Sequence, residues 1–295
     1  MNTLSGFAKQ LMLSGLDLNE RIVIGSLDDE EPLRDMFQVP EKPATYRPIF
    51  ALPALEIAIP VTGGLDSSAL YYMAEKEQRP VRAFYIDVDP PYRAKEIIAL
   101  EKMGIKFGYI NSGLKLDSRK FWKHIIPARN FYFLSLIAEK LERGGEIWFG
   151  ATAGEMPLKG GDKSLAFLDY CNRMFAKLPY PVVVKTPLSE MTKTDIVAWW
   201  IKNAPVEKLG LTISCFEAER GHCGHCQSCL RKALAYAANG LILQTNVDVR
   251  TGCTQYIEKY LTAFTKALRE RDFSHYSERR MRQDLRAIKL LMGRS

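Results

Sequence analysis

The chain has 295 residues, 47% hydrophobic and 25% charged, which is the ordinary mixture of a globular protein with a buried core. No apolar run reaches the roughly 20 residues that a membrane-spanning helix needs. The first residues lack the pattern of a secretion signal, so we expect a cytoplasmic protein without a membrane partner. The net charge is +7, and residues 254–295 hold ten Lys and Arg against five Asp and Glu. Such a tail is either a solvated helical face or a surface for nucleic acid.

Residues 1–50 mix an acidic run with four prolines and predict an irregular N-terminal extension. Short apolar runs then alternate with helical patterns. We expect strands at 57–61, 81–88, 106–110, 146–151 and 182–185, and helices at 67–77, 93–103, 121–142, 163–177 and 192–203. This alternation is typical of an α/β fold with a doubly wound parallel sheet and right-handed crossovers. After about residue 240 the pattern predicts helix alone.

A glycine-rich turn joins the first expected strand to the helix after it. It consists of Val61, Thr62, Gly63, Gly64, Leu65, Asp66, Ser67 and Ser68. Glycines let the backbone approach an anion closely, the N–H groups that open a helix point at it, and serine hydroxyls add donors. Asp66 either holds the amides of the loop or helps to coordinate magnesium. The turn therefore predicts a phosphate site, and the alternative is a tight turn without a ligand.

This turn resembles the Ser-Gly-Gly-x-Asp-Ser signature of the PP-loop ATP pyrophosphatase superfamily, with Thr62 in the first position. The resemblance implies that ATP is cleaved between its α and β phosphates and that AMP passes to an oxygen of the substrate. Pyrophosphate is released, and the adenylated oxygen leaves when a nitrogen or sulfur nucleophile attacks. Mg²⁺ would accompany ATP and neutralise charge on its phosphates.

Four of the six cysteines lie within fifteen positions, at Cys215, Cys223, Cys226 and Cys229. Their C-x7-C-x2-C-x2-C spacing suits tetrahedral zinc, and a closed shell of four sulfurs predicts a structural ion. An iron–sulfur cluster and a redox pair are the alternatives. We expect His222 and His225 to be exposed loop histidines, and Cys171 and Cys253 to be packing residues.

The glycine turn and the cysteine array together resemble the 7-cyano-7-deazaguanine synthases, the QueC-like enzymes of deazapurine and queuosine biosynthesis. Further segments agree in order and spacing: Ile126-Pro127-Ala128-Arg129-Asn130, Thr186-Pro187-Leu188, Lys193-Thr194-Asp195 and Leu211-Thr212-Ile213-Ser214-Cys215. The resemblance covers about residues 55 to 235. It implies an ATP-dependent carbon–nitrogen ligase that converts 7-carboxy-7-deazaguanine to the amide and then to the nitrile with ammonia.

The resemblance also implies roles for individual residues. Asp66, Arg129 and Lys193 would be catalytic, the last two as cations for the phosphates. The glycine turn and Asp87 would bind ATP, and Asn130, Glu155 and Asp162 would bind the substrate. Each has an ordinary structural alternative, such as a surface ion pair for Arg129, a helix cap for Asn130 and a plain loop carboxylate for the two acids.

The chain departs from the family pattern after the second and the fourth expected strands. Asp87 is retained, but the Gln-Arg-His that follows in the family is replaced, and residues 151–162 match only loosely. The acceptor and the nucleophile are therefore open. One alternative is a relative that joins a deazapurine or other acid to an amine of a protein or nucleic acid, and another is a tRNA-modifying thiolase. A non-catalytic zinc protein that binds nucleic acid is the rival from another class.

We expect four parts in the chain: an N-terminal extension (1–50), an ATP-binding α/β domain (51–210), a four-cysteine zinc module (211–235) and a helical basic extension (236–295). The tyrosine and phenylalanine residues at four-residue spacing in the last part predict a packing stripe, which docks either on the core or on a second copy in a homodimer.

Overall fold

A computed structural model describes residues 55–115, 128–153, 161–217 and 220–293 of the chain. The expected N-terminal extension at 1–50 and Glu155 lie outside the described residues. All described residues belong to one compact unit, Leu52–Ser295.

The centre of this unit is a parallel sheet with the strand order β3-β2-β1-β4-β5. The strands are β1 (Glu56–Pro60), β2 (Val81–Asp87), β3 (Phe107–Asn111), β4 (Gly145–Trp148) and β5 (Val182–Lys185). Every neighbouring pair runs parallel, from Ile57 opposite Val81 to Gly145 opposite Val182. The α/β fold class expected from the alternating pattern is confirmed.

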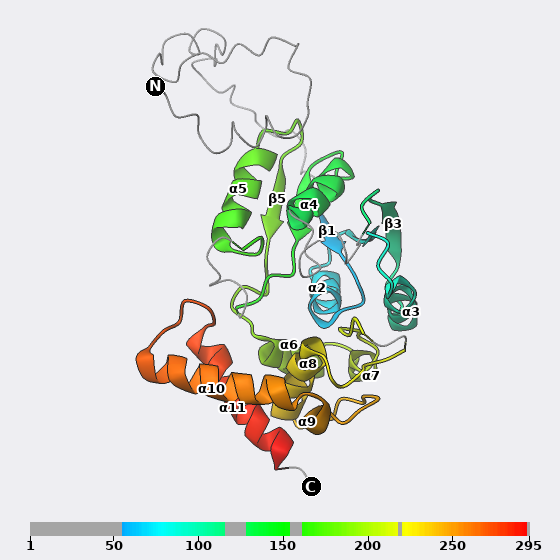
Figure 1. Ribbon diagram of the computed structural model, residues 1–295. Helices are drawn as coiled ribbons and strands as arrows, with labels where there is room; N and C mark the ends of the chain where they lie inside the picture. The colour runs from blue at the N-terminus through cyan, green and yellow to red at the C-terminus, as the bar shows by residue number, and fades with distance from the viewer. Residues whose placement is uncertain (1–54, 116–127, 154–160, 218–219, 294–295) are drawn as a thin grey trace, which may run out of the picture. The chain divides into compact units, whose positions relative to one another are not determined.

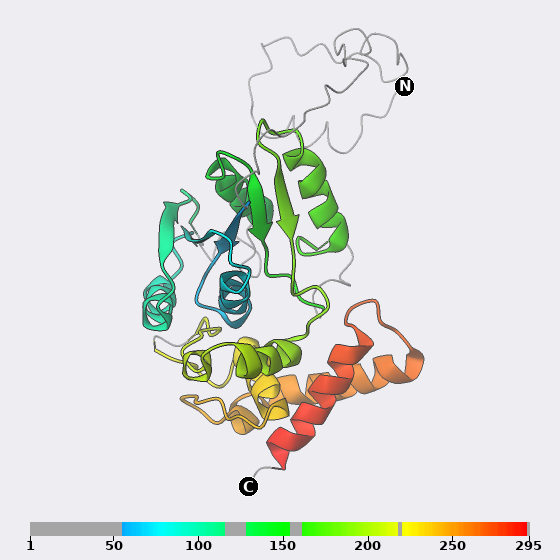
Figure 2. The same cartoon turned by 180° about the vertical axis from the view of Figure 1, so that it is seen from behind.

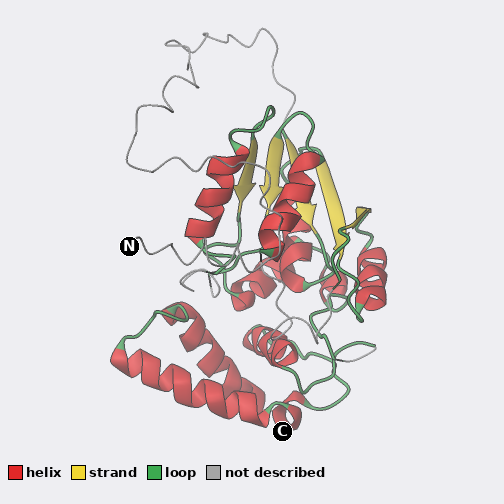
Figure 3. Ribbon diagram, turned by 45° about the horizontal axis from the view of Figure 1, so that its top comes forward, coloured by secondary structure: helices red, strands yellow, loops and turns green. Residues whose placement is uncertain are grey.

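Helices cover both faces of the sheet, as Figure 1 and Figure 3 show. They are α2 (Leu65–Glu75), α3 (Arg93–Met103), α4 (Arg129–Glu139), α5 (Leu165–Phe175) and α6 (Lys193–Asn203). Ile57 and Ile59 of β1 pack into a core with α2, α3 and α6, whereas Ala58 packs into a second core with α4 and α5. This split follows from the two-residue period of a strand, which turns successive side chains to opposite faces.

The fourth strand is shorter than the predicted 146–151. It ends at Trp148 because the chain then turns, and the N–H of Ala151 donates to the carbonyl of Phe149 at 3.0 Å. The turn brings Gly150 and Thr152 to the carboxyl end of the sheet, where they lie close to residues of the first helix and of α6.

A second group of helices follows the sheet: α7 (Val206–Leu209), α8 (Gln227–Ala238), α9 (Val249–Gly252), α10 (Thr254–Glu270) and α11 (Glu278–Met292). Leu230 and Leu234 of α8 form a core with Tyr260 and Phe264 of α10 and Ile288 of α11. Figure 2 shows α8 between α6 and the two long C-terminal helices. The aromatic stripe of the tail therefore packs within the chain, against α8.

One expectation for the C-terminal part needs qualification. Residues 241–248 are not helical, and they lie along the cysteine loop, where the N–H of Val247 donates to the carbonyl of Cys223 at 3.1 Å.

Among the described residues, no helix combines the length and the apolar character that crossing a membrane would require.

Candidate functional site

The glycine turn lies where the order of the sheet reverses. The chain leaves β1 toward β2 on one side, and β4 pairs with β1 on the other. In open parallel sheets, ligands bind outside the carboxyl ends of the strands at such a point. Gly150, just after β4, faces the turn, since a Cβ placed on it would stand 3.7 Å from the Cβ of Asp66.

The N–H of Thr62 in the turn donates to the Ser67 hydroxyl at 3.3 Å, and the amides that follow open the first turn of α2. Gly63 has a φ of +69°, and a Cβ there would meet the carbonyl oxygen of Glu96 at 3.0 Å. Gly64 is the N-cap of α2 and supplies no side chain to the first turn of the helix. The Ser68 hydroxyl is buried and has no partner among the described residues. These features fit a phosphate cradle, because the first N–H groups of a helix have no acceptor within it.

Lys193 reaches the glycine turn from a distant part of the chain. Its Nζ contacts the two carboxylate oxygens of Asp66 at 2.6 and 2.9 Å. A capping box between Thr192 and Asp195 begins α6 and fixes Lys193 at the first helical position. The structure thus brings together two residues that are 127 positions apart and that the sequence resemblance marked as catalytic.

Arg129 begins α4 directly after Ala128, which has a φ of 55°. Its guanidinium lies 5.9 Å from the ring of Phe133, and its Nε is buried without a partner among the described residues. Burial raises the pKa of Glu96, and the positive charge of Arg129 acts on that carboxyl in the opposite direction.

The expected substrate residues are only partly brought together. Asn130 is buried, and its side-chain amide donates to the backbone carbonyl of Asp162 at 3.4 Å. Asn130 does not cap α4, whose N-cap is Ala128. Asp162 itself is exposed, and Glu155 is outside the described residues.

Asp87 ends β2 and is almost fully buried. Burial would raise the pKa of its carboxyl, but hydrogen bonds from Tyr109, the N–H of Asp89 and Arg93 bring the pKa below the ordinary value. Arg93 contacts Asp87 at 2.9 Å. The carboxylate is therefore held as an anion by neighbouring side chains in this structure.

Glu96 lies on α3 behind the glycine turn. Its Oε2 accepts a hydrogen bond from the Tyr85 hydroxyl at 2.9 Å. Burial raises the pKa of Glu96 to about 7, and the bond from Tyr85 acts in the opposite direction. A carboxyl group in this position is neutral below about pH 7 in the folded chain.

We expect Glu96→Gln to flatten the pH dependence of stability. The folded pKa lies above the unfolded one, so the folded state binds the proton more tightly, and stability is lost as pH rises from about 4.5 to about 7. For one proton the slope is up to about 1.4 kcal/mol per pH unit. Urea unfolding at several pH values measures it, with Glu101→Gln on the exposed face of α3 as control. An unchanged slope in Glu96→Gln would contradict the assignment.

Cys215, Cys223, Cys226 and Cys229 form a compact group whose sulfur atoms all lie within 4.8 Å of one another. Cys223 Sγ and Cys229 Sγ are 3.8 Å apart. Four sulfurs at about 2.3 Å from a tetrahedral zinc ion are about 3.8 Å from each other. The cluster can thus hold a metal ion, and its geometry is compatible with zinc.

The two histidines of the cysteine loop differ from each other. His225 is exposed as expected, but the expectation for His222 is wrong, because it is only 5% exposed. Its Nε2 lies 3.3 Å from Nζ of the buried Lys232. Burial, with Lys232 adding to it, lowers the pKa of His222 to about 3, so the ring is neutral and can accept from the ammonium group. Cys171 and Cys253 are buried in the apolar cores, as predicted.

The cysteine loop is connected to the glycine turn through the segment before Cys215. The N–H of Ile213 donates to the carbonyl of Gly63 at 2.8 Å. Lys232, on the helix that begins at the cysteine cluster, donates to the carbonyl of Thr212. The two sites predicted from separate motifs are therefore in direct structural contact.

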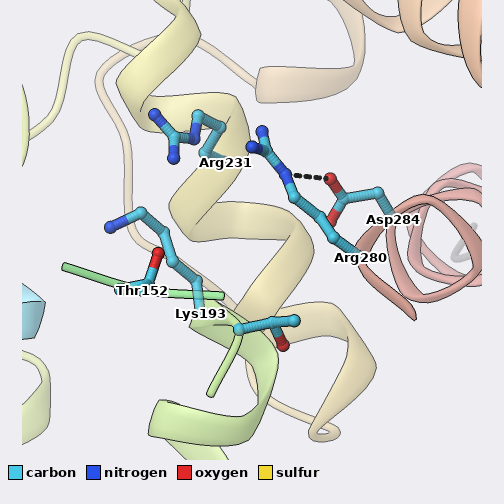
Figure 4. A pocket seen from close by; sticks show the side chains of 6 residues that line it. Thr152, Lys193, Arg231, Arg280 and Asp284 are labelled. Carbon is cyan, nitrogen blue, oxygen red and sulfur yellow. Dashed lines mark hydrogen bonds and ion pairs between the residues drawn. The ribbon is translucent and has the colours of Figure 1, made fainter. Parts of the chain in front are cut away.

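A small cavity of about 10 Å³ adjoins Lys193 and is drawn in Figure 4. Its lining comes from the segment after β4 and from α6, α8 and α11, and consists of Thr152, Thr192, Lys193, Arg231, Arg280 and Asp284. Sequence reasoning did not single out Arg231 or distinguish Arg280 from its basic neighbours. The available signal was the four-residue spacing of Arg280 and Asp284, which continues to the buried, apolar Ile288.

Comparison with known proteins agrees with the motifs. Residues 108–240 match the family model described as Queuosine biosynthesis protein QueC. The resemblance to this family is confirmed. The QueC match begins in β3 and ends just after α8, so it spans β4, α6, Lys193 and the cysteine cluster.

Several curated relatives are named 7-cyano-7-deazaguanine synthase. One from Persephonella marina is 26% identical over 215 residues, which cover 63% of this chain and 93% of the relative. Another from Methanothermobacter thermautotrophicus is 36% identical over 131 residues, 42% of this chain. That match spans 54% of the relative, about half of its length.

Proposed function

We propose that the chain is an ATP-dependent carbon–nitrogen ligase that adenylates 7-carboxy-7-deazaguanine, or a related acid, and uses ammonia to form the amide and the nitrile. One observation carries the proposal: the open amides of residues 63–67 lie at the switch point of the sheet, with the Asp66–Lys193 pair beside them. The names of the relatives support the substrate class.

The proposed reaction has two activations. A carboxylate oxygen attacks the α-phosphorus of ATP, the bond to the β-phosphate oxygen breaks, and pyrophosphate leaves. Ammonia then displaces AMP from the acyl carbon and gives the amide after loss of a proton. A second ATP adenylates the amide oxygen, and departure of AMP with loss of two protons leaves the nitrile.

The described residues have distinct roles in this proposal. The turn amides and serine hydroxyls hold the phosphates, and Lys193 and Arg129 balance the charge that grows on pyrophosphate. Asp66 orients Lys193 and can hold Mg²⁺, which would neutralise the phosphates. Asp87 would bind ATP at the end of β2, and Asn130 and Asp162, with Glu155, would bind the acceptor.

We also propose that Cys215, Cys223, Cys226 and Cys229 bind a structural zinc ion. The supporting observation is the tight grouping of the four sulfurs, which would fill all four coordination positions of a tetrahedral zinc ion. With all four cysteines committed to a metal, the described part of the chain offers no exposed cysteine near the glycine turn for a persulfide-based thiolase.

The basic C-terminal tail gives less support to a nucleic-acid-binding module. Arg279 contacts Asp195 at 2.8 Å, and Arg282 contacts Glu278 at 2.7 Å. These ion pairs neutralise charge that the sequence alone would assign to a polyanion surface.

The proposal is tested by mass spectrometry of products from 7-carboxy-7-deazaguanine, ATP, Mg²⁺ and ammonia. We expect the nitrile together with AMP and pyrophosphate. An amide without nitrile would limit the enzyme to the first activation. AMP formation that depends on a larger amine would identify a conjugating relative instead, and absence of any turnover with binding of nucleic acid would overturn the proposal.

A further inference from the structure

The cavity beside Lys193 gathers positive charge from three separate helices. Lys193 begins α6, Arg231 lies in the first turns of α8, and Arg280 lies in α11. Figure 4 shows Arg280 reaching toward Arg231, whose guanidinium points away from Arg280, to the side on which Lys193 also extends. Arg280 is only 7% exposed, so its charge is not simply solvated.

One carboxylate of the lining faces these three cations. Asp284 contacts the Nε of Arg280 at 3.4 Å. Burial raises the pKa of Asp284, while Arg280, Arg231 and Lys193 all act to lower it, so all three lie within its electrostatic reach. Converging cations in a partly buried cleft repel one another, and an added anion would offset that repulsion.

The wall of the cavity is held in place by α11. Arg279 and the amide of Gln283 contact the carboxylate of Asp195 at 2.8 and 3.0 Å. The Thr192 hydroxyl also donates to Gln283. Because Thr192 and Asp195 form the capping box before Lys193, the C-terminal helix positions the same helix end that reaches the glycine turn.

We propose that Arg231 and Arg280, with Lys193, form a binding site for the pyrophosphate end of ATP, so that the C-terminal helix completes the phosphate cradle. The inference rests on the proposed function, since it takes ATP as the substrate. Lys193 contacts Asp66 of the turn and also lines the cavity, so this one lysine borders both the cradle and the cavity.

The size of the cavity favours a phosphate oxygen over the acceptor. About 10 Å³ admits one atom the size of a water molecule, whereas a deazapurine ring would need far more space. A single terminal phosphate oxygen is therefore the part of the ligand that fits beside Arg280 and Lys193. The guanidinium groups present paired donors that match phosphate oxygens, and they stabilise pyrophosphate as it gains charge.

The test is calorimetric titration of the full chain with inorganic pyrophosphate and, separately, with AMP. We expect Arg280→Ala and Arg231→Ala each to weaken pyrophosphate binding by about tenfold or more, and to leave AMP binding within about twofold. Arg280→Lys should give a smaller loss. Arg282→Ala, which removes an exposed arginine of the same helix, should bind both ligands like the original chain.

Asp284→Asn supplies a variant that keeps both arginines. It removes the competing carboxylate, so pyrophosphate should bind at least as tightly as before. Equal losses for pyrophosphate and AMP, or unchanged pyrophosphate binding in Arg280→Ala, would overturn the proposal. If the arginine variants raise only the Michaelis constant for the acid, the cavity belongs to the acceptor site, and this result would also overturn the proposal. If the original chain binds pyrophosphate but forms no nitrile, the proposed substrate fails while this site stands.

Discussion

Asp66→Asn is expected to lower the rate of AMP formation by at least about a hundredfold, the loss typical when a preorganised charged contact is removed from a reacting group. The carboxylate contacts Lys193 through both oxygens, and the amide can offer one acceptor oxygen and no charge. AMP release from ATP measures the effect. The metal content should stay unchanged, because Asp66 is not among the clustered cysteines.

Asp169→Asn is the matched control, since it removes an exposed carboxylate of α5 that pairs with Arg173 in the same helix. It should retain full activity. Lys193→Met should match the loss seen in Asp66→Asn, and the double variant should lose little more than either one, because the two residues act as a unit. Near-normal AMP formation in Asp66→Asn would remove Asp66 from the proposed machinery.

Cys229→Ser is expected to release the metal, and ATP turnover should be lost as a consequence. Cys229 is fully buried in the four-sulfur cluster, and a structural zinc site contributes on the order of 10 kcal/mol to folding of its module. The module carries Cys215, two residues after Ile213, whose N–H holds the carbonyl of Gly63 in the glycine turn. Loss of zinc should therefore loosen the phosphate cradle.

The measurement combines elemental analysis for zinc with the AMP assay. Cys171→Ser is the control: that cysteine is equally buried, but it lies in the core under α5 and outside the cluster. It should keep its zinc and most of its activity. Metal-free protein with full ATP turnover would show that the contact between Ile213 and Gly63 does not depend on the ion.

The sequence predicts the features that depend on residues lying close together in the chain. Each strand and helix of the α/β part follows from a short apolar period, and the four clustered cysteines follow from their spacing within fifteen positions. The glycine turn is recognisable because backbone conformation and helix start lie in adjacent residues. The helix start at residue 192 was likewise predicted, and the structure forms a capping box there between Thr192 and Asp195.

Contacts between distant segments could not be predicted. An apolar stripe on α10 requires a partner but does not say which surface provides it, and α8 fills that role through Leu230 and Leu234. The same holds for Gln283, whose contact with Asp195 spans 88 positions. The burial of His222 was missed because nothing near it in the sequence indicates Lys232, which approaches from the following helix.

The central claim is that the glycine turn holds ATP so that its α-phosphorus receives an oxygen from the acceptor. Supplying the acid with ¹⁸O in its carboxylate tests this directly, because that oxygen departs with the phosphorus when ammonia attacks. Mass spectrometry should find one ¹⁸O in each AMP formed during the first activation. Unlabelled AMP, or ADP as the product, would contradict the account.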